Sequence, residues 1–444
     1  MPFENEVATG ESLLALQKSA ALRDFEGVIS IRNDSQPKDP PPIAQIQRTD
    51  WLPLRVVAID GSNITHKVRN GFPGAEASLV MLSVVFIDVS KLAKISPSEI
   101  PSPRIFNEMD RATTLDAVLP GSNIVRASET NDSPIRFFRK SVYDVLAGTL
   151  DSSHESLLDT WRQITAGRSA NIRCPAEGCN QNYRSGNREY SCSCERNERL
   201  FEADAFRFHE RFNELGSNGE VHGEVRHVLE VLSLVNILRF FERDDRIHYL
   251  RDCAFILDGP LAVFGQPAWI APYVRRELMR ISAKARQKNG TDLLCFGIEK
   301  TGQYVAHFSD IDWTDENGPR SKFPPGTVIA PDARYINRNI VFRPEDAKPS
   351  GIDTYFGRKV FYKTKNSAHA VLNTSIVNAD GEDFHNITPA AFPRLGEALN
   401  ILDHLSTYLY QDGFMPYRTK EVARSPSAEM LAKYYRGFRN SVRI

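Results

Sequence analysis

The sequence predicts an α/β protein in which a sheet is flanked by helices, and three observations support this class. Residues 54–59 and 253–257 are apolar runs of the length and composition of strands that are covered on both faces. Apolar residues recur at helical spacing in the long segment 221–241, which leads into the second run. The composition, with 41% hydrophobic and 25% charged residues, is that of a folded globular chain rather than a disordered one.

The length, net charge and apolar runs of the chain limit the classes of protein to which it can belong and the compartment in which we expect it. Its 444 residues are enough for two or three domains, and its net charge of −1 neither supports nor excludes a polyanionic partner. No apolar run approaches the roughly 18 residues of a membrane span. The start, Met1-Pro2-Phe3-Glu4, lacks the basic residues and apolar stretch of a secretory signal. We therefore expect a cytoplasmic protein without membrane contact, whose thiols stay reduced.

The N-terminal part has its own pattern. Apolar residues at helical spacing predict an amphipathic helix within residues 1–34, and the proline-rich segment 36–42 reads as a linker because it suits neither helix nor central strand. The predicted division is therefore an N-terminal helix and linker over 1–43, followed by the main domain over 44–444.

The first half of the main domain begins with a strand that is expected to end at Asp60. A second strand over 77–90 is expected as its hairpin partner. The charged stretch 94–132 gives no clear pattern, and 133–167 begins with helical spacing.

Residues 168–200 form a cysteine-rich insert without apolar periodicity. Two close thiol pairs suit tetrahedral Zn²⁺, which can order a loop too small to have its own core. With four thiolates the ion would be structural, since no position stays open for water. The alternative is a set of buried thiols without metal. The other two cysteines, Cys253 and Cys295, are expected in the core. The candidate zinc ligands are Cys174, Cys179, Cys192 and Cys194.

The second half alternates helices and strands. The predicted elements, in order, are a helical segment over 204–212, the long helix 221–241, a strand ending at Asp258, a basic helix over 272–288, a strand over 293–300 continued by 304–308, a hairpin (355–363 and 369–377) and a mostly helical end over 392–444. The turn after Lys300 is too short for a phosphate loop. Neither a nucleotide-binding glycine motif nor a Gly-x-Ser-x-Gly elbow occurs, which argues against an ATPase and the common serine hydrolases.

Two aspartates followed by glycine end the two most apolar strands. Asp60 precedes Gly61, and Asp258 precedes Gly259. Asp-Gly is a common turn, so each pair alone has a structural explanation. Two such pairs at strand ends favour a ligand site, because ligands bind at the carboxyl ends of strands in open α/β sheets.

A helical glutamate is a third candidate. Glu230 lies off the apolar stripe of the long helix, where a solvated glutamate is the alternative explanation. If the helix packs on the sheet, Glu230 could reach the two aspartates. Three adjacent carboxylates would repel each other unless Mg²⁺ or Mn²⁺ bound among them. Two such ions about 4 Å apart can hold and hydrolyse a phosphodiester.

Four stretches resemble the NurA nuclease family: Ala58-Ile59-Asp60-Gly61-Ser62, Arg226-His227-Val228-Leu229-Glu230, Phe255-Ile256-Leu257-Asp258-Gly259-Pro260-Leu261 and Gly297-Ile298-Glu299-Lys300-Thr301. The resemblance implies an RNase H-like fold and a metal-dependent DNA nuclease, a homodimer that works with a HerA-type hexameric ATPase. It also implies that Asp60, Glu230 and Asp258 bind the catalytic Mn²⁺ or Mg²⁺ ions, with Lys300 as a further catalytic candidate. Glu224, on the same helix, is the alternative to Glu230.

One departure from the family leaves two functions open. The family carries a C-terminal Tyr-Pro segment followed by a histidine, but neither Phe392-Pro393 nor Met415-Pro416 is followed by one at that spacing. Arg424 or Asn400 takes the place, depending on the alignment, and His404 is out of register. The chain is thus either an active DNA nuclease in end processing or defence against foreign DNA, or a weakened subunit that serves as a platform for DNA and the motor.

The tail 418–444 combines positive charge with aromatic residues. It holds seven basic residues against two acids, with Tyr434, Tyr435 and Phe438 among them. Such a segment suits contact with DNA or with the motor. The alternative is an amphipathic helix whose aromatic residues pack inward.

Overall fold

The computed structural model describes residues 41, 43–67, 74–92, 110–128, 132–166, 171–176, 178–184, 189–243, 245–314, 320–375 and 392–405, with isolated positions before residue 41. The chain divides into two compact units, 1–40 and 41–444, and the fold below is that of the second. The predicted N-terminal helix and the basic tail fall outside the described residues, so both stay predictions, as do the predicted domain boundaries.

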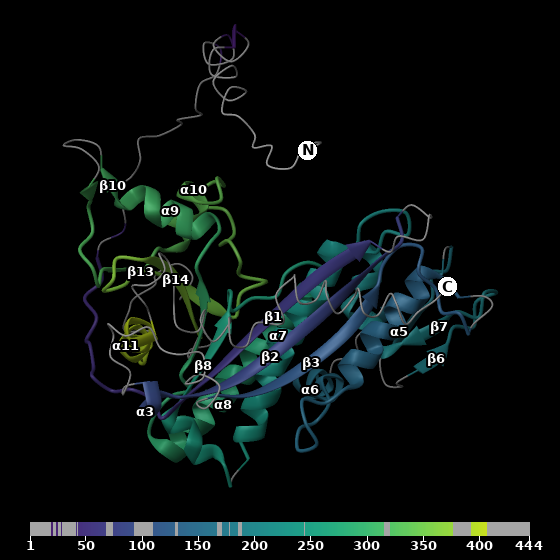
Figure 1. The fold of residues 1–444 in the computed structure, drawn as a ribbon, viewed down its shortest axis with the longest axis horizontal. Helices are drawn as coiled ribbons and strands as arrows, with labels where there is room; N and C mark the ends of the chain where they lie inside the picture. The colour runs from purple at the N-terminus through teal and green to yellow at the C-terminus, as the bar shows by residue number, and fades with distance from the viewer. Residues whose placement is uncertain are drawn as a thin grey trace, which may run out of the picture. The chain divides into compact units, whose positions relative to one another are not determined.

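A mixed sheet of eight strands forms the centre of the domain, in the order β12-β13-β14-β9-β8-β1-β2-β3 (Figure 1). β1, β2 and β3 form an antiparallel meander, and β8 and β9 continue the sheet parallel to β1. The predicted α/β class with a mixed sheet is confirmed. The strands are β1 (Arg55–Lys67), β2 (Glu76–Asp88), β3 (Asp110–Pro120), β8 (Cys253–Asp258), β9 (Cys295–Glu299), β12 (Val328–Ile329), β13 (Gly357–Lys363) and β14 (His369–Ser375).

One prediction for the meander was wrong, and one of its strands was not predicted. β1 does not end at Asp60 but continues to Lys67, because β2 pairs with it along its whole length, and Gly61 stays in the ladder. β3 lies in the charged stretch that gave no pattern. One side of this edge strand is exposed at Thr114, Asp116 and Val118, so its sequence lacks the apolar run of a buried strand.

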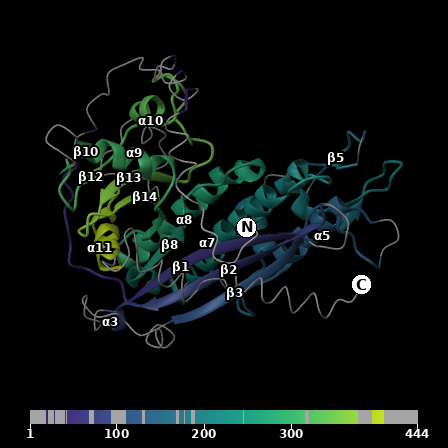
Figure 2. The same ribbon diagram turned by 45° about the horizontal axis from the view of Figure 1, so that its top comes forward.

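Helices cover both faces of the sheet (Figures 1 and 2). One face packs against α5 to α8, and the other, around Val56, Ala254 and Phe296, packs against α11. None of the described helices combines the length and hydropathy needed to cross a membrane. The helices are α3 (Val89–Leu92), α5 (Pro134–Ala147), α6 (Leu157–Ile164), α7 (Gly219–Phe241), α8 (Ala271–Asn289), α9 (Gln303–Asp312), α10 (Ala333–Asn339) and α11 (Leu395–Leu405).

The long predicted helix is α7, and it is more buried than its sequence pattern suggested. Every residue from Val228 to Leu238 is buried, since the helix lies between the sheet and neighbouring helices. Glu230, expected on a polar face, is therefore only 1% exposed.

Local conformation corrects two further predictions. The segment 204–212 is not one helix but two short 3-10 helices, because Arg207 between them has a left-handed φ of 63°. Residues 304–308 belong to α9 and not to a strand. Tyr304, Val305 and Phe308 follow helical spacing, and they pack with Phe361 on the sheet. The predicted basic helix and the 355–377 hairpin are confirmed as α8 and as β13 with β14.

Small two-stranded sheets complete the domain. The cysteine-rich insert folds into two hairpins, β4 (Asn171–Arg173) with β5 (Asn182–Arg184), and β6 (Glu189–Ser191) with β7 (Arg199–Phe201). A third pair, β10 (Trp313–Thr314) and β11 (Arg320–Ser321), follows α9.

Candidate metal-binding sites

The two aspartates occupy equivalent positions on neighbouring parallel strands. The parallel pairing of β1 with β8 ends at Ile59 opposite Leu257, and Asp60 and Asp258 are the next residues of the two strands. β8 stops there, and Gly259 turns the chain with a φ of 120°, a conformation that favours glycine. Asp258 is thus at a strand end, whereas Asp60 lies inside a longer strand.

Both aspartates face the side of the sheet opposite α7. Side chains alternate along a strand. Gly61 faces α7, because a Cβ added there would collide with Glu230. Leu257 packs in the core cluster that contains α7. The residue before Gly61 and the residue after Leu257 therefore face the other layer, so the two carboxylates share one side.

Lys300 and Ser62 belong to the same side. The Lys300 Nζ lies 2.7 Å from Asp258 Oδ1, and the two side chains are only 11% and 19% exposed. Partial burial strengthens such an ion pair relative to one on the surface. Ser62 shares the alternation of Asp60, and its Oγ is buried without a hydrogen-bond partner among the described residues. The site therefore offers anionic oxygens, a hydroxyl and one cation.

Glu230 approaches the aspartates from the opposite face. Its Oε1 accepts a hydrogen bond from Arg226 Nη1 at 3.0 Å, and its Oε2 lies 3.1 Å from His227 Nδ1. Asp60, Glu230 and Asp258 do not form a group of converging ligand atoms in the described part of the chain. The predicted third ligand thus lies against the backbone next to Asp60 rather than beside its carboxylate.

Glu224, the alternative to Glu230, lies elsewhere. It forms an ion pair with Arg211, and its carboxylate fills the space beside Gly265. Burial raises the pKa of Glu224 above its usual value, although Arg211 opposes this shift. Of the two glutamates, Glu230 is the one that adjoins Gly61 and hence the Asp60 position.

Sequence reasoning missed a buried cation beside this region. Lys359 on β13 lies between the rings of Tyr304 and Tyr355, 3.9 and 4.6 Å from their centroids, and it pairs with Glu299. Asn373 Nδ2 donates to the same carboxylate at 2.6 Å. Desolvation lowers the pKa of Lys359, although Glu299 opposes this. The available signal was a lysine directly before the apolar run Val360-Phe361-Tyr362.

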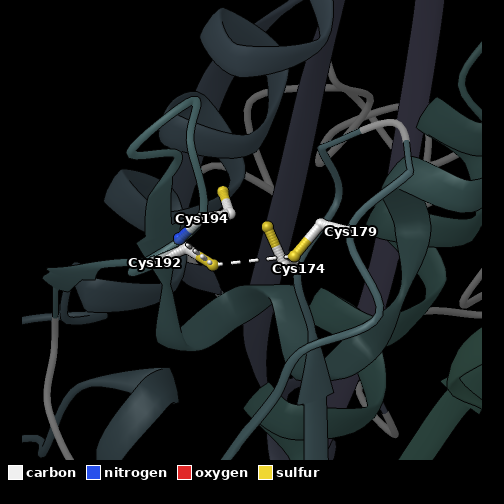
Figure 3. A group of neighbouring side chains, drawn as sticks. All are labelled: Cys174, Cys179, Cys192 and Cys194. Carbon is white, nitrogen blue, oxygen red and sulfur yellow. Dashed lines mark hydrogen bonds between the residues drawn. The ribbon is translucent and has the colours of Figure 1, made fainter.

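The four cysteines converge as predicted. Each hairpin of the insert supplies one pair, and Figure 3 shows the two pairs facing each other. All four Sγ atoms lie within 4.8 Å of one another, and none forms a disulfide. Backbone hydrogen bonds, first that from Glu198, lower the pKa of Cys194 to about 7, whereas burial raises that of Cys174. This group could hold a metal ion, and four thiolates in two hairpin loops suit tetrahedral Zn²⁺.

Ion pairs join the insert to α5. The buried Arg139 guanidinium donates to Glu198 at 2.8 Å and to Asp204 at 2.6 and 2.8 Å, and Arg136 contacts Glu198 as well. Burial alone would raise the pKa of Glu198, but the two arginines hold it below its usual value. The small core of the insert consists largely of the cysteine side chains, with Ala176 and Leu200. These ion pairs therefore attach the insert to α5, while a metal would order its two hairpin loops.

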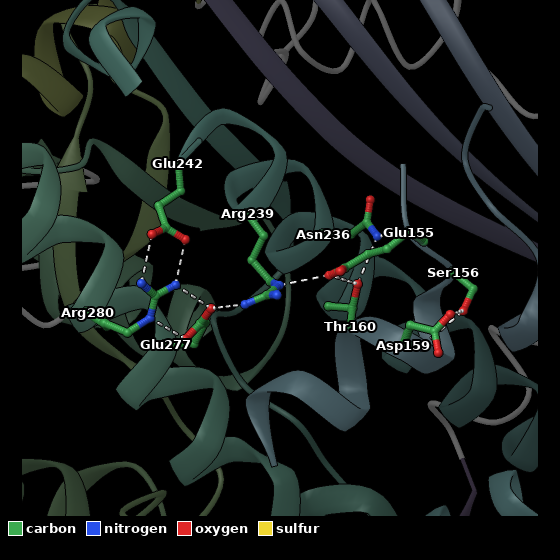
Figure 4. Close-up of polar contacts among 9 residues, drawn as sticks. All are labelled: Glu155, Ser156, Asp159, Thr160, Asn236, Arg239, Glu242, Glu277 and Arg280. Carbon is green, nitrogen blue, oxygen red and sulfur yellow. Dashed lines mark hydrogen bonds and ion pairs between the residues drawn. The ribbon is translucent and has the colours of Figure 1, made fainter. Parts of the chain in front are cut away.

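A polar pocket of about 390 Å³ lies where α7 ends. Arg239 at its wall donates to Glu155 at 2.8 Å and to Glu277 at 2.7 Å, so it connects α7 with the start of α6 and with α8 (Figure 4). Arg280 bridges Glu277 and Glu242 in the same network. Carboxylates already neutralise these cations. The pocket is thus an ion-pair junction between helices rather than a basic surface for phosphate.

Comparison with solved structures gives matches that include two NurA crystal structures. No family model matches the sequence, and no curated protein matches it. The crystal structure of the NurA nuclease from Sulfolobus solfataricus matches over 97% of this chain and 97% of that one, with 10% identity and a TM-score of 0.31. A second NurA crystal structure matches over 98% of this chain and 99% of that one, with 10% identity and a TM-score of 0.25. Both carry the name of the family that the sequence motifs resemble.

Proposed function

We propose that the chain is a NurA-like, metal-dependent deoxyribonuclease whose site is formed by Asp60, Asp258 and Lys300. The observation that carries the proposal is the placement of the two aspartates at equivalent positions of adjacent parallel strands, facing the same layer. Two carboxylates so close together require a compensating cation. Lys300 provides one positive charge, paired with Asp258. A divalent cation would provide the rest.

The residues fit Mn²⁺ or Mg²⁺. These ions prefer oxygen ligands, which Asp60 and Asp258 supply as carboxylates. The buried Ser62 Oγ, without a partner in the described ranges, is a neutral oxygen on the same side. The chemistry that a pair of such ions supplies is polarisation of a phosphodiester and a lower pKa for an attacking water. Lys300 would contact the substrate phosphate, a role that its ion pair with Asp258 supports.

Glu230 stays a predicted third ligand. To serve in that role, it would have to leave Arg226 and His227 and pass the Gly61 backbone, because it approaches from the α7 side. The four cysteines are proposed to bind one structural Zn²⁺, on the strength of their convergence.

The proposed partners are DNA, a HerA-like hexameric ATPase and a second copy of the chain, in DNA end processing or defence. The second candidate function, a weakened subunit that binds DNA and the motor, is favoured by one observation. His404, the C-terminal histidine that is out of register with the family pattern, uses its Nδ1 for a contact of 2.9 Å to the Asn400 carbonyl within α11. It is thus held by its own helix.

Cleavage of single- and double-stranded DNA with Mn²⁺, with and without chelator, tests the proposal. Asp60→Asn and Asp258→Asn should abolish Mn²⁺-dependent cleavage while the protein stays folded, because amides are poor substitutes for anionic ligands. Asp116→Asn, an exposed acid on β3, is the matched control and should cleave like the wild type. Wild-type rates in the folded Asp60 and Asp258 variants would refute the assignment. A wild type that binds DNA without cleaving it would support the platform function.

A further inference from the structure

One turn of α7 contacts the backbone that follows each of the two aspartates. Arg226 Nη1 donates to the carbonyl of Gly61, the residue after Asp60, at 2.7 Å. His227 Nε2 donates to the carbonyl of Ala262, in the segment after Asp258, at 2.8 Å. Adjacent residues of a single helix thus hold the two chain segments that leave the proposed site.

Several contacts hold the segment after Asp258, whose residues Leu261, Ala262 and Val263 are fully buried. Its backbone pairs with the loop before β13, where Val263 N donates to Thr354 O and Phe356 N donates to Leu261 O, both at 2.8 Å. The His227 ring also stacks on Phe264, with a centroid distance of 5.7 Å and an interplanar angle of 17°. His227 is therefore the polar contact of α7 with the Ala262 backbone, beside the apolar packing of Leu261 and Val263 in the core cluster that contains α7.

Glu230 orients both contacting side chains. Its carboxylate lies one helical turn further along α7, with one oxygen on Arg226 and the other on His227. At 1% exposure it has no access to water, so these two contacts determine its position. A carbonyl oxygen only accepts, so the Nε2 of His227 must carry its hydrogen, and Nδ1 faces Glu230.

We propose that Arg226 and His227 are positioning residues that hold the Asp60 and Asp258 segments in place where the pairing of β1 with β8 ends, with Glu230 as the anchor that orients them. The proposal rests on the proposed nuclease function. It assigns Glu230 to the support of the site rather than to metal coordination. None of the three side chains would touch the substrate, since they lie on the α7 face and the aspartates face the other layer.

The primary test is Mn²⁺ binding, monitored by the loss of the electron paramagnetic resonance signal of the free ion. DNA cleavage is the second test. Arg226→Met and His227→Phe remove the donors and should weaken Mn²⁺ binding and lower kcat at least tenfold, because small displacements of catalytic groups carry large rate penalties. The KM for DNA should stay within about twofold, since no DNA contact is lost. Arg226→Lys and His227→Gln keep a donor and should recover most of the loss.

Arg239→Met is the matched control. Arg239 lies on the same helix and holds Glu155 and Glu277, but it contacts neither segment that follows an aspartate. It should lower the melting temperature while leaving Mn²⁺ binding unchanged. If the Arg226 and His227 variants behaved like this control, with reduced stability alone, the positioning role would be wrong.

The variant Glu230→Gln distinguishes the two roles of Glu230, as an anchor for Arg226 and His227 or as a metal ligand. A glutamine can accept from Arg226 and donate to His227, so an anchor should tolerate the change with Mn²⁺ binding within about threefold of the wild type. A metal ligand would lose binding to the extent seen in Asp60→Asn. If the wild type does not bind Mn²⁺ and Asp60→Asn does not lower DNA cleavage, the proposed nuclease function is wrong, and so is the positioning role. If it binds and cleaves but the Arg226 and His227 variants are unaffected, only the positioning role fails.

Discussion

Replacing Gly61 by alanine should destabilise the protein because the added methyl group would displace the buried side chain of Glu230. The added Cβ would lie 2.9 Å from Arg226 Cγ and closer still to Glu230 Oε1, whereas real Cβ contacts are essentially never below 3.0 Å. Glu230 is buried, so it has no solvent to move into. The methyl group can be accommodated only if the carboxylate leaves Arg226 or His227.

The magnitude follows from those two contacts. Overpacking of a well-packed site typically costs about 1–3 kcal/mol. Loss of one hydrogen bond to a charged group costs about 1.5–3 kcal/mol. Because the shift relieves the clash as it breaks the bond, the two costs overlap rather than add. We expect Gly61→Ala to lower the free energy of unfolding by about 1.5–3 kcal/mol.

Urea unfolding of the full chain, followed by tryptophan fluorescence and circular dichroism, measures this change. Gly223→Ala is the matched control. Gly223 lies inside α7, and a Cβ built there meets nothing within 4 Å. The free energy of unfolding of this variant should rise by up to about 1 kcal/mol, because alanine has a higher helix propensity than glycine. A Gly61→Ala stability within about 0.5 kcal/mol of the wild type would refute the packing argument, since surface changes usually fall in that range.

The remaining predictions concern zinc, pH and the tail. Protein purified without added metal should contain one Zn²⁺ per chain, and Cys192→Ser should lose it; negligible zinc with four titratable thiols in the wild type would exclude the site. Arg280 and Lys284 lower the pKa of Glu242 to about 2 from 4.5, so Glu242→Gln should be less stable than the wild type at pH 7, and the difference should shrink as the pH falls from 4.5 toward 2. Equal unfolding free energies at pH 7 would contradict this. Neutralising Arg436, Arg439 and Arg443 should flatten the salt dependence of DNA binding by about one unit of slope per lost phosphate contact, and an unchanged slope would discard the DNA role of the tail.

Local patterns predicted well the elements that local interactions determine. The strand ending at Asp258 was recognisable because five apolar residues run into Asp-Gly-Pro. The cysteine group was recognisable because each pair lies within one hairpin loop. The end of β1 was not, because its continuation beyond Asp60 depends on pairing with β2, which the Asp-Gly pair does not reveal.

The surroundings of the site depended on contacts between distant segments. The alternation around Gly61 decides that Asp60 and Glu230 lie on opposite faces, and the sequence alone placed them together. His227 gave no signal, because its partner is a backbone carbonyl at residue 262, and carbonyls have no sequence signature. The burial of Glu230 likewise follows from the helices that enclose α7.

The shared attachment of both aspartate segments to α7 has a mechanical consequence. A sliding or tilting of the whole helix would carry Gly61 and Ala262 in the same direction, since adjacent residues hold them. The separation of the two carboxylates should then change less under rigid motion of α7 than under distortion of the turn that carries Arg226 and His227. A displacement of α7 would thus act on both segments alike, beyond the point where the pairing of β1 with β8 ends.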